Sequence, residues 1–342
     1  MGYAASSAAP PGPVFAIGGA GGFLGAHLVR GFEARGGSVL PLVRTVVGSS
    51  PAGARALDAV LADRKALEGV ETFVHAAAVR QHYGIDDATY RDSNIDLVER
   101  AIRNSAAAGV RRFVFVSCVG VYGYPHHLPV TEETPYAPRT AYFGAKVEAE
   151  VRARRVAREL SIELVIVRPA PTYGPGDRNG VLEKMATLIR VSTYRVVGSG
   201  KNVLHHVHVD DVVEGVWLAA TRPEAAGEEF ILAGPETTTL EELSALVARA
   251  LGRSLSRQHV PTAVARAVAT AVDAAAQYGV AFATHEPPVN HEKLDAMTLP
   301  MAFDIARARR LLGFAPAVGY EEGVMRTLRG QWPSLARVGA EP

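Results

Sequence analysis

The chain contains a single cysteine, Cys118, and no block of like charges. One cysteine excludes an intramolecular disulfide framework and favours a reducing compartment, so we expect a cytoplasmic protein. The 36 basic and 35 acidic residues leave a formal net charge of +1, which argues against nucleic acid or an anionic membrane surface as a partner. No apolar run reaches the ~18 residues of a membrane span. A small molecule is therefore the expected partner.

With 342 residues, of which 48% are hydrophobic, the chain can bury a sizeable core. The most apolar helical segment, residues 262–283, contains Arg266 and Asp273. We interpret it as a core helix of a second domain; the alternative is a surface helix that covers an apolar substrate. Residues 1–13 are rich in Ala, Ser, Pro and Gly and predict a disordered tail rather than a signal peptide. Residues 333–342 are expected to form a second tail.

A glycine-rich turn at residues 18–25 follows an apolar run at 14–17 and precedes a helical pattern. Gly19, Gly22 and Gly25 repeat at every third position, a variant of the dinucleotide-binding fingerprint. Glycine lets the backbone turn tightly and approach a ligand closely. The amino terminus of the following helix attracts negative charge, so the turn suits the pyrophosphate of a dinucleotide.

Strands and helices alternate over the first half of the chain. Nearly continuous apolar strands are predicted at 38–43, 70–74, 112–116 and 162–167, with helices at 90–108 and 142–159. Such strands are typical of a parallel sheet covered on both faces. We therefore predict an α/β fold, with a doubly wound parallel sheet (Rossmann) over residues 14–170. A smaller C-terminal α/β substrate domain is predicted over 171–332, with 203–234 returning to the first domain.

The predicted second strand ends at an arginine, Arg44, and no carboxylate lies nearby. In Rossmann units a carboxylate at this point binds the ribose hydroxyls of NAD, whereas arginine accommodates the additional phosphate of NADP. We favour NADP as the cofactor and leave NAD open, because Arg44 could also be a solvated loop charge.

Tyr142 and Lys146 lie four residues apart at the start of a predicted helix, so their side chains share one face. A phenol with a pKa of ~10 is a poor proton carrier at neutral pH, but a neighbouring ammonium group favours the phenolate. The chain has only five lysines, which makes a lysine at this spacing less of a coincidence. This pair predicts an acid/base tyrosine tuned by a lysine.

Further motifs follow in a fixed order. They are Gly-Gly-Ala-Gly-Gly-Phe-Leu-Gly at 18–25, His-Ala-Ala-Ala at 75–78, Asn94, Ser-Cys-Val-Gly-Val-Tyr-Gly at 117–123, Tyr-Phe-Gly-Ala-Lys at 142–146, Arg-Pro-Ala-Pro-Thr-Tyr-Gly-Pro-Gly-Asp at 168–177, His-Val-Asp-Asp at 208–211 and Ala-Arg-Arg-Leu-Leu-Gly-Phe-Ala-Pro at 308–316. Together they resemble the extended short-chain dehydrogenase/reductase family, the epimerase/dehydratase and hydroxysteroid-dehydrogenase-like group, over residues 14–332.

The resemblance implies that Tyr142 donates or accepts the proton at the reacting oxygen and that Lys146 supports it. It also implies hydride transfer to or from a nicotinamide and suggests a homodimer formed by the helices that hold Asn94 and Tyr142. The predicted cofactor site comprises Gly19, Gly22, Phe23, Leu24, Gly25, Arg44, Ala76, Ala77, Ala78, Asn94, Tyr142, Lys146 and Pro169.

Three departures from the family pattern bear on the substrate. Cys118 stands where the family usually has a Ser or Thr that polarises the substrate oxygen, and a thiol is a weaker donor. We place Cys118 in the catalytic site; the task could instead fall to Ser117, or Cys118 could be a small apolar filler. Pro171 and Leu204 replace the Asn and Arg that serve nucleotide sugars, which favours an uncharged substrate, although another arginine could substitute.

A histidine-rich stretch follows, with His205, His206 and His208 before Asp210 and Asp211. Alternate residues of a strand share a face, so a metal site is conceivable. The family motif offers a non-metal role, and we predict no metal.

These observations predict an NADP-preferring oxidoreductase that interconverts a secondary alcohol and a ketone on a steroid-like or other apolar hydroxyketone. A nucleotide-sugar epimerase or dehydratase is the nearest alternative. A cofactor-binding regulator without turnover, suggested by Cys118, is the second alternative.

Overall fold

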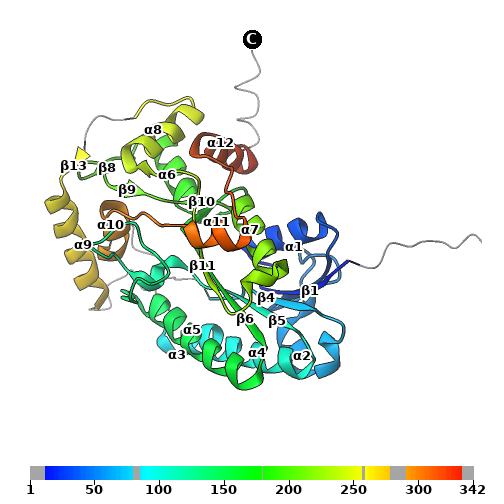
Figure 1. Cartoon of the computed structure of the whole chain (residues 1–342). Helices are drawn as coiled ribbons and strands as arrows, with labels where there is room; N and C mark the ends of the chain where they lie inside the picture. The colour runs from blue at the N-terminus through cyan, green and yellow to red at the C-terminus, as the bar shows by residue number, and fades with distance from the viewer. Residues whose placement is uncertain (1–11, 80–84, 179, 256–258, 278–289, 333–342) are drawn as a thin grey trace, which may run out of the picture.

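The computed structural model describes residues 12–79, 85–178, 180–255, 259–277 and 290–332. The predicted tails lie almost entirely outside these ranges. In the described chain, seven parallel strands form one sheet in the order β11-β6-β5-β4-β1-β2-β3, with helices on both faces (Figure 1). The predicted doubly wound Rossmann fold is confirmed.

Five strands of the sheet come from the predicted apolar runs, whereas its two edge strands, β3 and β11, were not predicted. Its strands are β1 (Val14–Gly18), β2 (Ser38–Val43), β3 (Arg55–Ala56), β4 (Thr72–His75), β5 (Arg112–Val116), β6 (Glu163–Pro169) and β11 (Glu229–Leu232). The inner strands β4 and β5 are buried throughout, because helices cover both of their faces. In a parallel sheet all strands end at the same edge, so the segments after β1, β2, β4, β5 and β6 meet there.

Two layers of helices cover the sheet. One layer consists of α1 (Phe23–Glu33), α7 (Val209–Thr221) and α11 (Ala306–Leu312), and the other of α2 (Leu57–Ala62), α4 (Leu97–Ala107) and α5 (Ala141–Leu160). Shorter helical segments are η1 (Arg64–Leu67), α3 (Asp87–Tyr90), η2 (Arg91–Asp96), η3 (Val119–Tyr122) and η4 (Pro223–Ala225). Each layer buries an apolar core against its face of the sheet.

A smaller C-terminal part stands above the carboxyl edge of the sheet (Figure 1). Its helices are α6 (Val181–Arg190), α8 (Leu240–Ala250), α9 (Thr262–Gln277), α10 (His291–Thr298) and α12 (Tyr320–Gln331). Three two-stranded ladders accompany them, formed by β7 (Thr172–Tyr173) with β10 (Val207–His208), β9 (Val203–Leu204) with β12 (Thr238–Thr239), and β8 (Val196–Val197) with β13 (His259–Val260). A separate core joins α6, α8 and α12.

The two parts of the molecule are tied together by buried polar contacts. The Asp211 carboxylate, at the start of α7, accepts hydrogen bonds from the backbone N–H groups of Ala317 (2.9 Å) and Val318 (3.1 Å). The His205 ring contacts the Gly234 carbonyl at 3.0 Å. The first two contacts hold the segment before α12 against α7. The third joins the segment after β11 to the segment before β10.

The interpretation of residues 262–283 as a core helix is wrong for the described part, α9. Ala265 and Ala269 are buried beside Leu294 of α10, but Val264 and Val268 remain 52% and 48% exposed. Residues 278–283 lie outside the described residues. No helix in the described ranges combines the length and the apolar character that crossing a membrane requires.

Candidate active site

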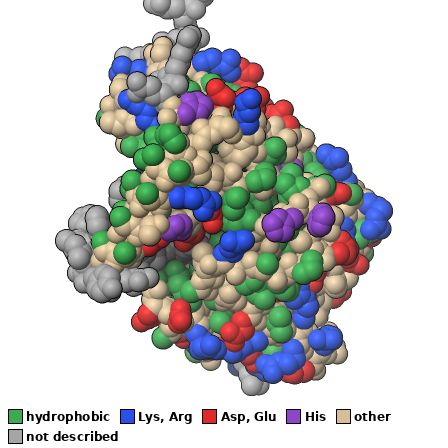
Figure 2. Space-filling view, turned by 90° about the vertical axis from the view of Figure 1, so that its left-hand side faces the viewer, with side chains coloured by type: hydrophobic (Ala, Val, Ile, Leu, Met, Phe, Trp, Pro, Cys, Tyr) green, Lys and Arg blue, Asp and Glu red, His purple; other side chains and the backbone are tan. Residues whose placement is uncertain are grey.

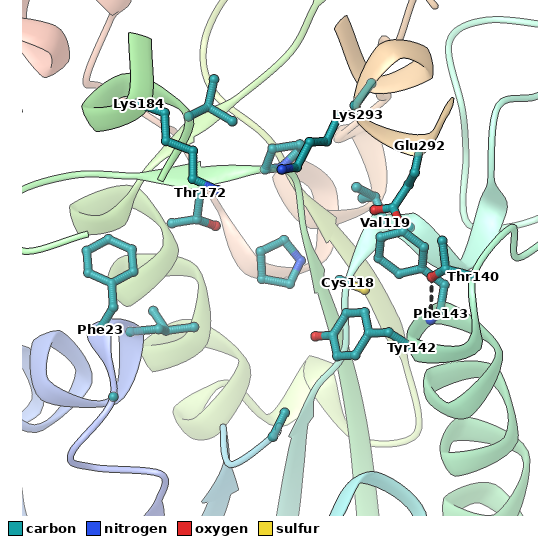
Figure 3. Close-up of a pocket in the computed structure, with 18 of the residues that line it drawn as sticks. Phe23, Cys118, Val119, Thr140, Tyr142, Phe143, Thr172, Lys184, Glu292 and Lys293 are labelled. Atoms are coloured by element: carbon teal, nitrogen blue, oxygen red, sulfur yellow. Dashed lines mark hydrogen bonds between the residues drawn. The ribbon is translucent and has the colours of Figure 1, made fainter. Parts of the chain in front are cut away.

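One large cavity, about 1960 Å³ in volume, opens between the sheet half and the C-terminal part. Its floor consists of the segments that leave the carboxyl ends of the strands, and its roof comes from α6, α9 and α10 (Figure 3). Ligand pockets usually measure roughly 300–1,000 Å³, so this one has room for two ligands side by side. Of the predicted site residues, it is lined by Gly19, Gly22, Phe23, Leu24, Gly25, Arg44, Ala76, Ala77, Ala78, Cys118, Tyr142, Lys146 and Pro169.

The glycine turn links β1 to α1 at the bottom of this cavity. Gly19 has φ +86°, and a Cβ atom there would come within 2.7 Å of the Ala77 backbone nitrogen. A Cβ atom at Gly25 would overlap the Gly19 carbonyl oxygen. Position 19 therefore requires glycine because of its backbone conformation, and positions 19 and 25 both require it because a Cβ atom would not fit. The free N–H groups at the start of α1 face the cavity, a suitable cradle for a pyrophosphate.

Arg44 lies directly after β2, on the cavity wall beside the glycine turn. Its side chain is exposed, and within the described ranges it forms no ion pair. A second arginine of the same wall, Arg100, is bound to Asp58 at 2.8 Å. Arg44 is thus the cation at this end of the cavity that remains available for an anionic ligand.

Asn94 is the one predicted cofactor residue that is not among the lining residues. It is buried one layer behind the wall, where its amide holds both backbone groups of Val79, accepting from N–H at 2.7 Å and donating to the carbonyl at 3.0 Å. Asn94 lies in η2, which is a π-helical turn, so the predicted continuous helix over 90–108 is interrupted here. Any effect of Asn94 on a cofactor passes through the backbone that follows β4.

Tyr142 lies in the first turn of α5, on the cavity wall. The helix begins there because the Thr140 hydroxyl accepts a hydrogen bond from the Phe143 N–H group at 3.2 Å. The Tyr142 ring packs between those of Tyr90, 5.9 Å away, and Phe143, 5.3 Å away. Its hydroxyl points into the cavity (Figure 3).

Lys146 lies one turn further along α5 and is only 3% exposed. Its ammonium donates to the Val116 carbonyl at 3.2 Å and lies 5.0 Å from the centre of the Phe115 ring. Burial lowers the pKa of Lys146, while the neighbouring Cys118 and Glu150 oppose this shift. Tyr142 and Lys146 both line the cavity, and the tuning of the phenol by the ammonium stays a prediction.

Cys118 follows β5 and is half-buried, with its sulfur facing the cavity (Figure 3). Burial raises the pKa of its thiol to about 11, although the Lys146 charge acts in the opposite direction. The residue is therefore a neutral thiol at pH 7, able to donate a weak hydrogen bond. Ser117, the alternative donor, is buried and is among the groups that lower the pKa of Glu150.

Replacing Cys118 with serine is expected to raise kcat/KM for ketone reduction by about fivefold. A hydroxyl donates a stronger hydrogen bond than a thiol, and a neutral hydrogen bond contributes about 1 kcal/mol. Steady-state kinetics of both forms at matched cofactor saturation measure the change. Cys118→Ala is the control and should lose activity. If serine and alanine behave alike, Cys118 does not donate to the substrate.

A buried ionic cluster beneath the site was not anticipated from the sequence. Glu150 and Arg168, both fully buried, are joined by two hydrogen bonds of 3.0 and 2.6 Å. Arg168 also donates to the hydroxyls of Tyr122 and Tyr136, each at 2.8 Å, and to Glu229 at 2.5 Å. Burial alone would raise the pKa of Glu150, but the Arg168 guanidinium holds it below its usual range.

This cluster connects motifs that the sequence analysis had left without a role. Tyr122 comes from the Val-Tyr-Gly motif and Arg168 from the Arg-Pro motif, while Glu150 lies one helical turn after Lys146. It therefore fixes α5 to the ends of β5 and β6, where Cys118 and Pro169 line the cavity. The signal available in the sequence was an arginine, Arg168, directly after the predicted apolar strand 162–167.

His205, His206 and His208 each contact a different partner in the protein. His206 lies on the cavity wall, 3.1 Å from the Tyr320 hydroxyl, and burial lowers its pKa to about 4. His208 caps α7 through the Asp210 N–H group at 3.2 Å. Among the described residues, no group of three His, Cys, Asp or Glu side chains is placed to hold a metal ion.

The nucleotide-sugar positions also line the cavity. Pro171 and Leu204 form part of its wall and offer no side-chain charge. Arg178 and Arg195, the arginines that could compensate, line it as well. The cavity is therefore lined both by the uncharged residues at the two nucleotide-sugar positions and by two arginines that could supply the missing charge.

A parallel Rossmann sheet, a glycine cradle at its carboxyl edge and an adjacent Tyr-Lys pair define a dinucleotide-dependent oxidoreductase class. The comparison with protein families agrees: residues 15–233 match the model of the NAD dependent epimerase/dehydratase family. The chain belongs to this family and is an NAD(P)-dependent enzyme of the extended short-chain dehydrogenase type.

Similar proteins support this assignment. The chain is 30% identical to the uncharacterized protein y4nL of Sinorhizobium fredii, over 89% of this chain and 85% of that protein. It is 28% identical to the 2-alkyl-3-oxoalkanoate reductase of Stenotrophomonas maltophilia, over 90% and 96%. The solved structure of MoeE5 in complex with UDP-glucose and NAD has the same fold, with a TM-score of 0.74, 21% identity and coverage of 95% and 100%.

Proposed function

We propose that the protein is an NADP-preferring oxidoreductase that interconverts a ketone and a secondary alcohol on an apolar, steroid-like or other hydroxyketone substrate. The observation that carries the proposal is that Tyr142, Cys118 and the buried Lys146 line one cavity. The glycine cradle lines the same cavity, so a cofactor and a substrate would meet there.

The bound nicotinamide supplies the hydride when a ketone is reduced. Tyr142 then gives its phenolic proton to the oxygen of the reduced carbon, and it accepts that proton in the reverse direction. The Lys146 ammonium stabilises the phenolate that forms. The Cys118 thiol donates a hydrogen bond to the same substrate oxygen and thereby helps to position the substrate.

Two further points support an apolar ketone. Pro171 and Leu204 give the substrate wall no charge where nucleotide-sugar enzymes use Asn and Arg. The relative from Stenotrophomonas maltophilia is described as a reductase of a 3-oxo acid, and the similarity spans nearly the full length of both chains.

The proposal is tested by cofactor difference spectra followed by a panel of ketones and secondary alcohols, with UDP- and TDP-sugars included. We expect NADPH to be consumed with at least one apolar hydroxyketone and no turnover of the nucleotide sugars. NADPH binding without reduction of any ketone would contradict the proposal.

The position of Arg44 supports the NADP preference. Arg44→Ala is expected to raise the KM for NADPH by roughly 10–100-fold, because a hydrogen bond to a charged group contributes about 1.5–3 kcal/mol. The KM for NADH should change by less than about threefold. Arg55→Ala is the matched control, because Arg55 is an exposed arginine on the neighbouring strand outside the cavity lining. Equal effects on both cofactors would overturn the preference.

A nucleotide-sugar epimerase or dehydratase is the second candidate, favoured by Arg178 and Arg195 on the cavity wall. Such an enzyme returns the hydride to its substrate and retains its cofactor. Tight cofactor retention through purification, together with binding of UDP or TDP, would favour it over the ketone reductase.

A further inference from the structure

Two helices on the substrate side of the cavity expose large apolar side chains toward it. Val181 and Leu188 of α6 are 55% and 45% exposed, and Val264 and Val268 of α9 are 52% and 48% exposed. All four line the cavity that Tyr142 also lines. Single exposed apolar residues are ordinary, but these four line the same cavity, and we call the part of the cavity that they line the groove.

The spacing of these residues gives the groove its shape. Val264 and Val268 are one helical turn apart, and Val181 and Leu188 two turns apart, so each pair forms a stripe along its helix. In α9 the helix packs by its small residues Ala265 and Ala269, which leaves the valines toward the opening. Figure 2, which views the molecule from the side on which α9 lies, shows hydrophobic side chains exposed across this face.

The lining contributed by α6 and α10 combines methionines with charged side chains, among them Lys184, Glu292 and Lys293 (Figure 3). Three of the five methionines of the chain, Met185, Met297 and Met301, line the cavity. Methionine adapts its shape to irregular or mobile apolar ligands, because its side chain is unbranched and has several rotatable bonds. The three methionines therefore suit a ligand with a flexible alkyl chain better than one with a flat, rigid ring system.

We propose that the groove between α6 and α9 binds a linear alkyl chain of the substrate, while its ketone lies at Tyr142. This inference rests on the proposed function and deepens it, because it selects long-chain aliphatic ketones over steroid-like ones. The cavity volume of about 1960 Å³ leaves room for such a chain beside a dinucleotide.

The stripe on α6 sets the expected chain length. Seven residues of α-helix rise by roughly 10 Å. An extended alkyl chain rises by roughly 1.3 Å per carbon, given C–C bonds of about 1.5 Å. The length of the stripe therefore matches about eight carbons of an extended alkyl chain.

The test is a series of 3-oxoalkanoate methyl esters with alkyl chains from four to twelve carbons, measured as kcat/KM with saturating NADPH. Burial of each methylene is expected to raise kcat/KM by about two- to fourfold up to about eight carbons, and then to level off. A rigid steroid ketone is measured in parallel. No rise with chain length, or a steroid preferred over every linear ketone, overturns the inference.

The variant Val264→Asn/Val268→Asn locates the effect in the groove. It should lower the ratio of the ten-carbon to the four-carbon kcat/KM at least tenfold, because polar side chains no longer bury the chain. Val191→Asn is the control: Val191 is 62% exposed, yet lies outside the cavity lining, and its variant should keep the native ratio. Equal ratios in all three proteins overturn the inference.

Binding of n-alkanols from butanol to decanol, measured by calorimetry with NADP present, separates the two proposals because it needs no turnover. If no ketone is reduced but decanol binds more tightly than butanol, and only the double variant loses this difference, the groove is established and the proposed reaction fails. If ketones are reduced but binding shows no dependence on length, the reaction is supported and the groove is refuted.

Discussion

Replacing Tyr142 with phenylalanine is expected to lower kcat for ketone reduction by about 10²–10⁴-fold, the range for loss of a general acid. The substitution removes the hydroxyl that points into the cavity and keeps the ring that packs between Tyr90 and Phe143. Cofactor affinity should change by less than about threefold, since the glycine cradle and Lys146 are untouched. Single-turnover oxidation of NADPH, with fluorescence titration of the cofactor, measures both quantities.

Tyr90→Phe is the matched control for this variant. It removes a hydroxyl from the adjacent ring, which is buried and lies outside the cavity lining. Its kcat should stay within about threefold of the native value. A Tyr142→Phe enzyme with native kcat would remove the central residue of the proposed mechanism.

Arg168→Met is expected to lower the free energy of unfolding at pH 7 by about 3–5 kcal/mol, because it leaves a buried carboxylate without its main partner. Glu150 and Arg168 are both fully buried, and methionine preserves much of the apolar volume. Urea unfolding followed by circular dichroism measures the loss. A loss below about 1 kcal/mol would show that the cluster does not carry this stability.

The loss should shrink as the pH falls. In the native protein the pKa of Glu150 is lowered, so its contribution is present above the unfolded-state value and is lost as the pH falls through the folded-state value. Without Arg168 burial would raise that pKa, and the variant would gain stability by taking up a proton. The difference in stability is therefore expected to be smaller at pH 5 than at pH 8.

Arg154→Met is the internal control within the same cluster. Arg154 contacts Glu150 at 3.0 Å and Glu229 at 2.5 Å, but its side chain is 27% exposed. Solvent compensates for part of its loss, so we expect a change of roughly 1 kcal/mol. The double variant Arg168→Met/Glu150→Gln should recover part of the stability lost in Arg168→Met, because no buried charge is then left alone.

The sheet could be predicted because its signal is local. Residues 38–43 and 112–116 are runs of apolar side chains bounded by polar ones, and they match β2 and β5 residue by residue. The helix that holds Tyr142 and Lys146 could be predicted for a similar reason, and the four-residue spacing places both on one face of it; their roles stay predictions.

The remaining features depend on contacts between distant segments. The π-helical turn at Asn94 accompanies hydrogen bonds to Val79, 15 residues away, and no helical periodicity contains that information. The exposure of α9 was missed because a pattern shows which face of a helix is apolar, but not what covers that face. The Glu150–Arg168 pair joins α5 to β6, and only the assembled sheet reveals it.

The path of the chain between the two parts limits how the enzyme can be re-engineered. After β6 the chain enters the roof at β7 and α6 and returns to the sheet for α7 and β11. It then leaves again for α8 to α10, comes back at α11 and continues into α12. The substrate-binding part could not be replaced by that of another enzyme as one contiguous segment, because such a segment would also contain elements of the Rossmann core. New specificity would have to come from individual substitutions on α6, α9 and α10, with the surrounding scaffold left intact.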